Sequence, residues 1–211
     1  MTKVEKLLAA KLLKIKAVKL QPNNPFIWAS GWKSPIYCDN RKTLSYPIVR
    51  NFIKLELCRL IREKYPDTEV IAGVATGAIA QGALVAEELG LPFIYVRSAP
   101  KDHGLENLIE GDLIPKQKVV VIEDLISTGG SSLKAVEVIR QNGGEVLGMM
   151  AIFTYSMSVA EKAFKEAMLS LTALCRYEVV LEEALRINYI SEIDLDTLNE
   201  WKKNPANWQQ K

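Results

Sequence analysis

The sequence predicts an α/β fold with a mostly parallel sheet flanked by helices. Four runs rich in Val, Ile and Ala have the length of buried strands: residues 70–74, 93–97, 118–123 and 146–153. Helical segments lie between them, including residues 78–89, which end at Gly90, and residues 131–141, which end at Asn142. Continuous apolar strands that alternate with helices form parallel sheets covered on both faces, and ligands of such sheets bind at the carboxyl ends of the strands.

The N-terminal region is expected to hold one helix and one irregular segment. Thr2 and Glu5 have the spacing of a capping box, so residues 2–17 predict an amphipathic helix with lysines on its solvent side. Residues 21–47 are rich in Pro and Asn and show no regular periodicity. Their aromatic residues are expected either to form ordinary core or to close over a flat ligand: Phe26, Trp28, Trp32, Tyr37 and Tyr46.

Further helices are predicted on either side of the strands. Ser45 and Pro47 are expected to open a helix that Pro66 closes. The apolar positions of that helix are Ile48, Phe52, Leu55 and Leu60. Residues 159–168 predict a helix after the last strand, and the stretch from Arg176 onward predicts appended helices.

Composition excludes several classes of protein. The 211 residues suffice for one main core but not for an additional (β/α)8 barrel of about 250 residues. Hydrophobic residues make up 48% and charged residues 25%, as in soluble globular proteins, and no apolar run approaches a bilayer span. A net charge of +2 predicts neither nucleic-acid nor membrane binding. Three separated cysteines without a C-x-x-C pair indicate no disulfide framework and no zinc site, which favours a cytoplasmic location.

The segment from Val119 to Ser132 carries the strongest chemical signal. A buried strand leads into Glu123 and Asp124, and a turn of small residues then leads into a helix. We expect the strand to end at the acids, so that both carboxylates can reach ligand hydroxyls. Residues 127–131 are expected to hold a phosphate with backbone N–H groups and a helix N-terminus. An acid pair alone would more simply end a strand and cap a helix, but the three-part pattern favours a sugar phosphate. It matches neither the G-x-G-x-x-G nor the G-x-x-x-x-G-K-[ST] pattern.

The stretch from Ser98 to Gly111 is a second candidate functional segment. It is long, charged and without periodicity, and it lies between two predicted core strands. Loops of this length inside a domain are more often functional than not. It contains His103, the only histidine of the chain, in a polar Lys-Asp-His-Gly sequence that favours a phosphate contact over a place in the core.

The acid-pair segment resembles the phosphoribosyl-pyrophosphate (PRPP) binding motif of the phosphoribosyltransferases. Three further segments resemble those of orotate phosphoribosyltransferase: residues 30–41, 97–104 and 73–77. The resemblance implies a type I phosphoribosyltransferase fold with a small N-terminal flap or hood. It further implies a single domain, with residues 1–45 as helix and flap, 46–175 as PRPP-binding core and 176–211 as C-terminal helices.

The same resemblance implies a glycosyltransferase of de novo pyrimidine biosynthesis. Such an enzyme transfers the 5-phosphoribosyl group from PRPP to orotate with Mg²⁺, giving orotidine 5′-monophosphate and diphosphate. The implied PRPP-binding residues are Ala75, Thr76, Gly77, Arg97, Lys101, His103, Glu123, Asp124, Leu125, Ile126, Ser127, Thr128, Gly129, Gly130 and Ser131. The implied orotate contacts are Ser127, Lys33 and Tyr37. The implied catalytic residues are Lys101, His103 and Asp124.

The resemblance also implies a homodimer with shared active sites, because Lys101 and His103 lie on a loop that reaches the partner subunit's site. Mg²⁺ would be held through PRPP, with Asp124 as the candidate side chain and no other direct ligand. Lys33 and Arg41 would either hold the substrate carboxylate or only anchor the flap. Cations at the diphosphate stabilise the leaving group as its charge grows.

The chain departs from the family pattern at four places. Ala29 and Ser98 stand where several members have lysines. Ala75-Thr76 stands for a Tyr-Lys pair, and an arginine late in the fold is replaced near Thr154-Tyr155. The positive charge at these places must therefore come from other residues.

Two alternative functions are open at this point. A purine phosphoribosyltransferase would share the Glu123-Asp124 motif but not the segment of residues 30–41. A non-catalytic PRPP-sensing regulator would need a nucleic-acid-binding element, for which the lysine-rich helix of residues 2–17 is the candidate.

Overall fold

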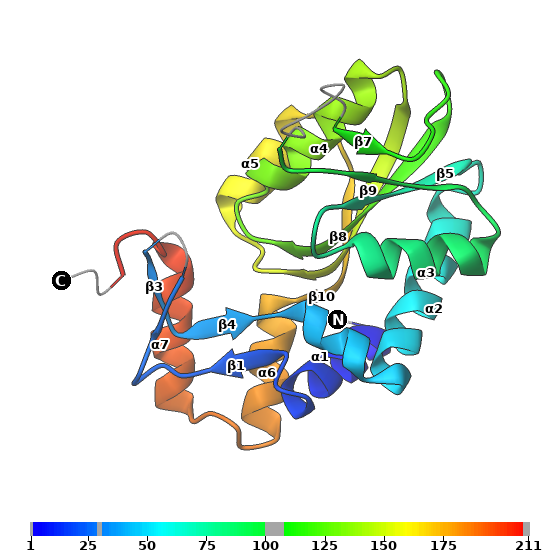
Figure 1. The fold of residues 1–211 in the computed structure, drawn as a ribbon. Helices are drawn as coiled ribbons and strands as arrows, with labels where there is room; N and C mark the ends of the chain where they lie inside the picture. The colour runs from blue at the N-terminus through cyan, green and yellow to red at the C-terminus, as the bar shows by residue number, and fades with distance from the viewer. Residues whose placement is uncertain (1, 29–30, 100–107, 209–211) are drawn as a thin grey trace.

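A six-stranded sheet forms the centre of the molecule, in the order β10-β9-β8-β5-β6-β7 (Figure 1). The computed structural model describes residues 2–28, 31–99 and 108–208. All strand pairs of this sheet are parallel except the pair of β6 and β7. The strands are β5 (Val70–Val74), β6 (Phe93–Val96), β7 (Ile109–Glu110), β8 (Lys118–Ile126), β9 (Glu145–Thr154) and β10 (Leu171–Arg176). The predicted α/β fold is thus confirmed.

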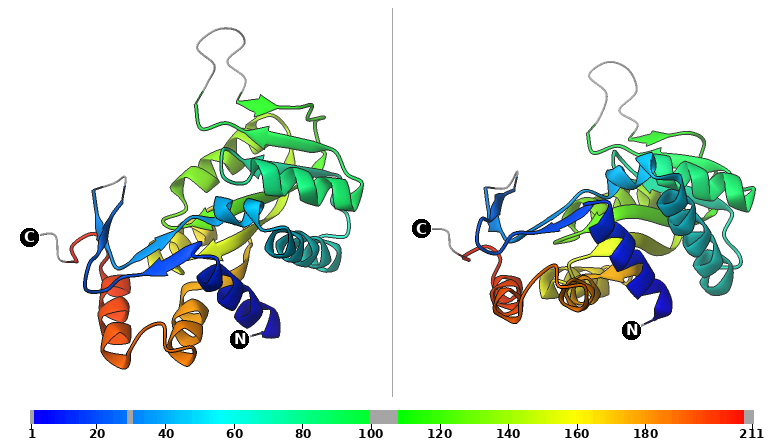
Figure 2. Two further views of the ribbon diagram at one scale, coloured as in Figure 1. Left: turned by 60° about the horizontal axis from the view of Figure 1, so that its bottom comes forward. Right: turned by 90° about the horizontal axis from the view of Figure 1, so that it is seen from below.

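Helices cover both faces of the sheet (Figures 1 and 2). One face carries α2 (Pro47–Lys64) and α3 (Ile79–Leu89), and the other carries α4 (Gly130–Gln141) and α5 (Ser158–Glu166). Successive residues of β8 enter alternate cores: Val120 and Ile122 face α2 and α3, while Val119 and Val121 face α4 and α5. Because β8 is buried on both sides, its sequence is a continuous apolar run. Gly90 ends α3 in the left-handed conformation, as the sequence predicts.

The first helix, α1 (Lys3–Lys14), begins with the predicted capping box. The Thr2 hydroxyl accepts a hydrogen bond from the Glu5 N–H at 3.2 Å, and the Glu5 carboxylate accepts one from the Thr2 N–H at 2.7 Å. The helix ends at residue 14 instead of 17, since Lys16 takes a positive φ of 56° and β1 follows. It packs on β10 and α6 (Tyr177–Arg186).

The start and the buried face of α2 differ from the prediction. Pro47 is in the first turn, but the N-cap is Tyr46, and no side chain caps the helix there. Two of the apolar positions expected on its packed face are exposed, Ile48 by 78% and Leu55 by 52%. The helix instead packs through Val49, Ile53, Leu57, Cys58 and Ile61. Ile48 and Leu55 are seven residues apart and therefore share the opposite face.

The region expected to be irregular contains short strands. β1 (Val18–Leu20) pairs antiparallel with β4 (Ile36–Cys38), and β2 (Phe26–Ile27) pairs antiparallel with β3 (Lys33–Ser34). A 3-10 helix, η1 (Asn40–Ser45), follows. These strands have only two or three residues, too few to give a periodic pattern, which is why the prediction of an irregular segment was wrong. We call residues 18–38 the flap.

The C-terminal helices are α6 and α7 (Glu192–Lys203), as predicted, but the strand β10 before them was not predicted. In Figure 1, α7 lies beside the flap strands. Trp28 of the flap contacts Trp201 of α7 with ring centroids 5.6 Å apart. None of the helices within the described ranges is long and apolar enough to cross a bilayer.

Candidate active site

Three neighbouring strands, β5, β8 and β9, bring their carboxyl ends to one edge of the sheet. The turn after β5 contains Ala75, Thr76 and Gly77, and Ser127 follows β8 directly. Tyr155 follows β9, and its N–H donates to the carbonyl of Ile126 at 3.0 Å. Segments that the resemblance places around PRPP therefore meet at the edge where parallel sheets bind ligands.

The strand β8 does not end at the acid pair, so this part of the prediction was wrong. It continues to Ile126, with Leu125 opposite Phe153 and Ile126 opposite Thr154 in β9. The ladder persists because apolar residues follow the acids. Glu123 points to the α4 side, where it bonds Ser132, and Asp124 lies against Gly77 on the other side. The alternation then breaks, because Leu125 packs with the α2 and α3 core and Ile126 with the α4 and α5 core.

The two carboxylates have different environments. Glu123 is 5% exposed, accepts a hydrogen bond from the Ser132 hydroxyl at 2.7 Å and another from the Asp124 N–H at 2.9 Å. Asp124 is half-buried, and the Asn40 side-chain amide donates to its backbone carbonyl at 2.6 Å. Glu123 is thus bound within the protein. The Asp124 carboxylate is hydrogen-bonded to Glu123 and to the Leu125 backbone, and it is the more exposed of the two.

Burial raises the pKa of both carboxyl groups above the ordinary range. For Glu123 the negative charge of Asp124 adds to this effect. For Asp124 the charge of Asp39 raises the pKa further, and the Arg41 guanidinium opposes it.

The raised pKa of Glu123 predicts a pH-dependent stability. In the folded protein the Glu123 carboxyl group keeps its proton at pH values where the same group in the unfolded chain, with a glutamate pKa of about 4.3, has lost it. The free energy of unfolding should therefore fall as pH rises from about 5 to 8, with a contribution from this one proton of at most about 1.4 kcal/mol per pH unit. Glu123→Gln should remove that contribution, as urea unfolding across this range would show.

Glu183 supplies the matched control for this experiment. It is as buried as Glu123, but hydrogen bonds from Arg186 lower its pKa. Glu183→Gln should therefore leave the slope above about pH 5 unchanged. A Glu123→Gln variant with the wild-type slope would show that Glu123 is ionised in the folded protein.

Gly77 leaves the space that the Asp124 carboxyl group occupies. A Cβ atom at position 77 would collide with all three atoms of that group. The Asp124 side chain would have to turn away, because the backbone at Gly77 is fixed by the turn after β5.

Gly77→Ala should consequently lower turnover by about a hundredfold, the cost of displacing a catalytic group by about 1 Å. The fold should remain, since the group that moves is the end of a side chain. Initial rates and thermal unfolding of the variant would test this, and an unchanged rate would contradict the placement of Asp124 in the site.

The turn from Ser127 to Gly129 has the features of a phosphate-binding loop. Gly129 has a φ of 83°, and a Cβ there would approach Phe164 Cε2 to 2.8 Å, so only glycine fits. Gly129 is also the N-cap of α4, and no side chain caps this helix. Its first N–H groups are therefore available to an anion, with the helix dipole favouring negative charge.

A polar cavity of about 400 Å³ lies between the acid pair, the turn after β5 and η1. Its lining residues are Cys38, Asp39, Arg41, Val74, Ala75, Thr76, Gly77, Glu123, Asp124, Leu125, Ser127 and Ser131. Eight predicted PRPP-binding residues are therefore brought together. Ile126 is fully buried in the core, and Thr128, Gly129 and Gly130 lie beside the cavity in the turn without lining it. Cys38, Asp39 and Val74 were not predicted, although all three fall within segments that carry the resemblance.

An aromatic cavity of about 320 Å³ adjoins the polar one. Its lining residues are Ile27, Trp28, Tyr37, Cys38, Leu125, Ser127 and Tyr155. Cys38, Leu125 and Ser127 line both cavities, so the two lie side by side. Ser127 and Tyr37, two predicted orotate contacts, lie here. Tyr155 was not predicted as a contact, and its position after β9 was the available signal.

The predicted cations are less close together. Arg41 is the only basic residue that lines the polar cavity within the described ranges, and its Nε bonds Asp39 at 2.8 Å. Arg97 lines a neighbouring cavity of about 550 Å³, which shares Val74, Ala75 and Ser131 with the polar one. Lys33 lines none of these three cavities. Lys101 and His103 lie outside the described residues.

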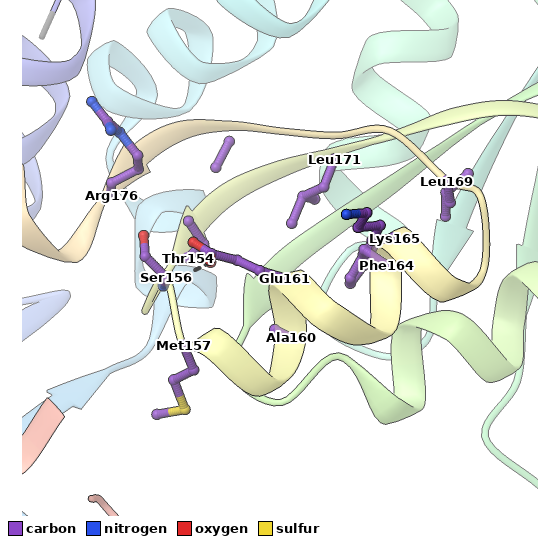
Figure 3. A pocket seen from close by; sticks show the side chains of 11 residues that line it. Thr154, Ser156, Met157, Ala160, Glu161, Phe164, Lys165, Leu169, Leu171 and Arg176 are labelled. Carbon is purple, nitrogen blue, oxygen red and sulfur yellow. Dashed lines mark hydrogen bonds between the residues drawn. The ribbon is translucent and has the colours of Figure 1, made fainter. Parts of the chain in front are cut away.

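Another cavity, of about 370 Å³, lies between α5 and the last two strands (Figure 3). Its walls are largely apolar, with Phe164, Leu169 and Leu171 among them. The Arg176 side chain at one end is bonded to Glu5 of α1, with Nε and Oε1 2.7 Å apart. This cavity contains neither the acid pair nor the glycine turn and is not the candidate site.

Comparison with known proteins agrees with this geometry. The family model described as phosphoribosyl transferase domain matches residues 53–170. An orotate phosphoribosyltransferase of Phocaeicola vulgatus is 68% identical over 209 residues, which cover 99% of each chain. The chain belongs to the orotate phosphoribosyltransferase family. This membership supports the orotate hypothesis and not the purine alternative or the PRPP-sensing regulator.

Solved structures of the family share the fold. Orotate phosphoribosyltransferase from Aeropyrum pernix has a TM-score of 0.72 at 27% identity, over 87% of this chain and 99% of that chain. UMP synthase of Leishmania donovani has a TM-score of 0.80 at 25% identity, over 94% of this chain but only 42% of that chain. The type I phosphoribosyltransferase fold expected from the resemblance is therefore confirmed.

Proposed function

We propose that the chain catalyses the transfer of the 5-phosphoribosyl group from PRPP to orotate, giving orotidine 5′-monophosphate and diphosphate. The observation that carries the proposal is that the two cavities lie side by side and share three lining residues. One is lined by a carboxylate and the turn that precedes an uncapped helix, and the other by aromatic rings. A sugar phosphate fits the first and a flat base fits the second, with the bond to be formed at their junction.

The described residues have distinct roles in this proposal. Asp124 accepts hydrogen bonds from the ribose hydroxyls, and the N–H groups at the start of α4 bind the 5′-phosphate. Gly77 and its neighbours approach the diphosphate closely because they have no bulky side chains. Ser127 lies at the junction and contacts orotate, and Tyr37 covers the base. The protein thus positions two reactants, which by itself accelerates a bimolecular step strongly.

The departing diphosphate gains negative charge and needs cations. Arg97 borders the neighbouring cavity, and the resemblance assigns Lys101 and His103 to this task as well. Arg41 at the polar cavity is a further cation that compensates for the lysines missing at Ala29, Thr76 and Ser98. Such charges stabilise the transition state more than the bound substrate, because the charge on the leaving group increases as the bond breaks.

The donors present fit Mg²⁺ held through the substrate. The described residues contain no group of three or more His, Cys, Asp or Glu side chains that could hold a metal ion by themselves. Asp39 and Asp124 nevertheless line the same cavity, and Mg²⁺ is commonly bound by one or two carboxylates together with substrate phosphates. Bound there, the ion would neutralise charge on the diphosphate. We infer that Asp124 is the carboxylate nearest to it.

We also propose a homodimer with shared sites in a reducing, cytoplasmic environment. The exposed apolar face of α2, with Ile48 and Leu55, offers a surface for a second copy. Cys38, Cys58 and Cys175 are all buried and unpaired, as in proteins kept reduced.

A direct assay tests the proposed reaction. Purified protein mixed with orotate, PRPP and Mg²⁺ should consume the ultraviolet absorbance of orotate and release diphosphate. Hypoxanthine or adenine in place of orotate should give no product. Consumption of a purine, with orotate unchanged, would contradict the proposal.

A further inference from the structure

We propose that Tyr155 determines base specificity, by donating a hydrogen bond from its hydroxyl group to an oxygen at the edge of the pyrimidine. The inference rests on the proposed function and assigns a contact to a residue outside the predicted set. Tyr155 lies directly after β9, beside Ser127 at the end of β8, and lines the aromatic cavity.

The ring of Tyr155 is held firmly. Phe153 and Trp201 pack against it edge to face, with centroids at 5.2 and 5.7 Å. Trp28 and Tyr177 lie tilted against it at 5.3 and 6.3 Å. The side chain is only 2% exposed, so it has little freedom to choose another rotamer. A group fixed in this way loses little entropy when a ligand binds.

The hydroxyl of Tyr155 has no partner among the described residues. No hydrogen bond within the described residues involves the Tyr155 hydroxyl. The described side-chain atoms that have no hydrogen-bond partner and are inaccessible to solvent belong to Asn40, Arg50, Gln81 and Trp201, and the Tyr155 oxygen is not among them. The small exposed part of the residue therefore includes this oxygen. Because Tyr155 lines the aromatic cavity, the proposal places its hydroxyl there. A buried hydroxyl without a partner is costly, whereas one that a ligand satisfies adds both affinity and selectivity.

The electrostatic environment keeps this hydroxyl protonated. Burial raises the pKa of Tyr155 well above its usual range, and the neighbouring Cys38, Tyr177 and Tyr37 add to this effect. The group is therefore a neutral donor throughout the physiological range. Orotate offers two ring carbonyls and a carboxylate as acceptors, whereas hypoxanthine has one carbonyl oxygen and adenine has none.

Tyr155→Phe removes the hydroxyl while keeping the ring and its packing. Its KM for orotate should rise by about fivefold to tenfold, the cost of one hydrogen bond, while its KM for PRPP stays unchanged. Tyr177→Phe is the matched control, because Tyr177 belongs to the same aromatic cluster but its hydroxyl donates to the Leu198 carbonyl at 2.9 Å. It should lower the thermal midpoint and leave both KM values unchanged.

Two results would overturn the assignment of Tyr155. One is an unchanged KM for orotate in Tyr155→Phe. The other is a parallel rise of both KM values together with a loss of stability like that of Tyr177→Phe, which would make the hydroxyl structural. In both cases the wild-type protein still consumes orotate; a wild-type protein that leaves orotate untouched would instead contradict the proposed function.

Discussion

Asp124→Asn should lower the rate of orotate consumption by about a hundredfold or more, while the protein stays folded. The carboxylate lines the polar cavity. In the proposed reaction it accepts hydrogen bonds from the ribose and balances the charge that develops on the sugar as diphosphate leaves. An amide has the same shape but lacks the negative charge. Since burial raises the pKa of Asp124, ionising this group already costs the folded state free energy, and a neutral replacement should not destabilise it.

Initial rates and thermal unfolding together check this expectation. Asp67→Asn is a suitable control, because Asp67 precedes β5 and pairs with Lys118 at the opposite end of β8, with its side chain 74% exposed. That variant should keep the wild-type rate. If Asp124→Asn keeps more than about a third of the wild-type activity, Asp124 makes no contact specific to the transition state.

Mixing two inactive variants should restore activity if the sites are shared. Lys101→Ala should lower turnover more than PRPP binding, because the role proposed for this cation is to neutralise the leaving diphosphate. With Asp124→Asn in one subunit and Lys101→Ala in the other, one of the two sites contains an intact aspartate and an intact lysine. Random exchange makes about half of all dimers hybrid, so about a quarter of the wild-type activity should return.

A second mixture separates this effect from simple stabilisation. Gly77→Ala and Asp124→Asn both damage the polar cavity of their own subunit, so their hybrid has no intact site and should stay inactive. Restoration in both mixtures, or in neither, would show that Lys101 does not act across a dimer interface.

Local signals predicted most of the framework. The capping box of Thr2 and Glu5 and the helix end at Gly90 could be predicted, because both depend only on neighbours in sequence. The apolar run of β8 showed a strand buried on both faces. The same argument failed at the acid pair, since the pairing of Leu125 and Ile126 with β9 extends the strand past two charged residues.

The base end of the site could not be predicted in the same way. Tyr155 and Trp28 are far apart in sequence and meet only through tertiary packing, with ring centroids 5.3 Å apart. Trp201 completes their contact from α7, which lies beyond residues 53–170, the range that the family model matches. Single-sequence periodicity describes each element but carries no information on which elements touch.

The contact of Trp28 with Trp201 also constrains when this enzyme becomes active during its synthesis. The two residues lie far apart in the sequence, and both rings pack on Tyr155. A nascent chain can form the polar cavity once β9 has emerged from the ribosome, since every residue that lines it precedes that strand. The wall around the base stays incomplete until α7 has been made. A partly translated chain should therefore bind PRPP before it can discriminate among bases.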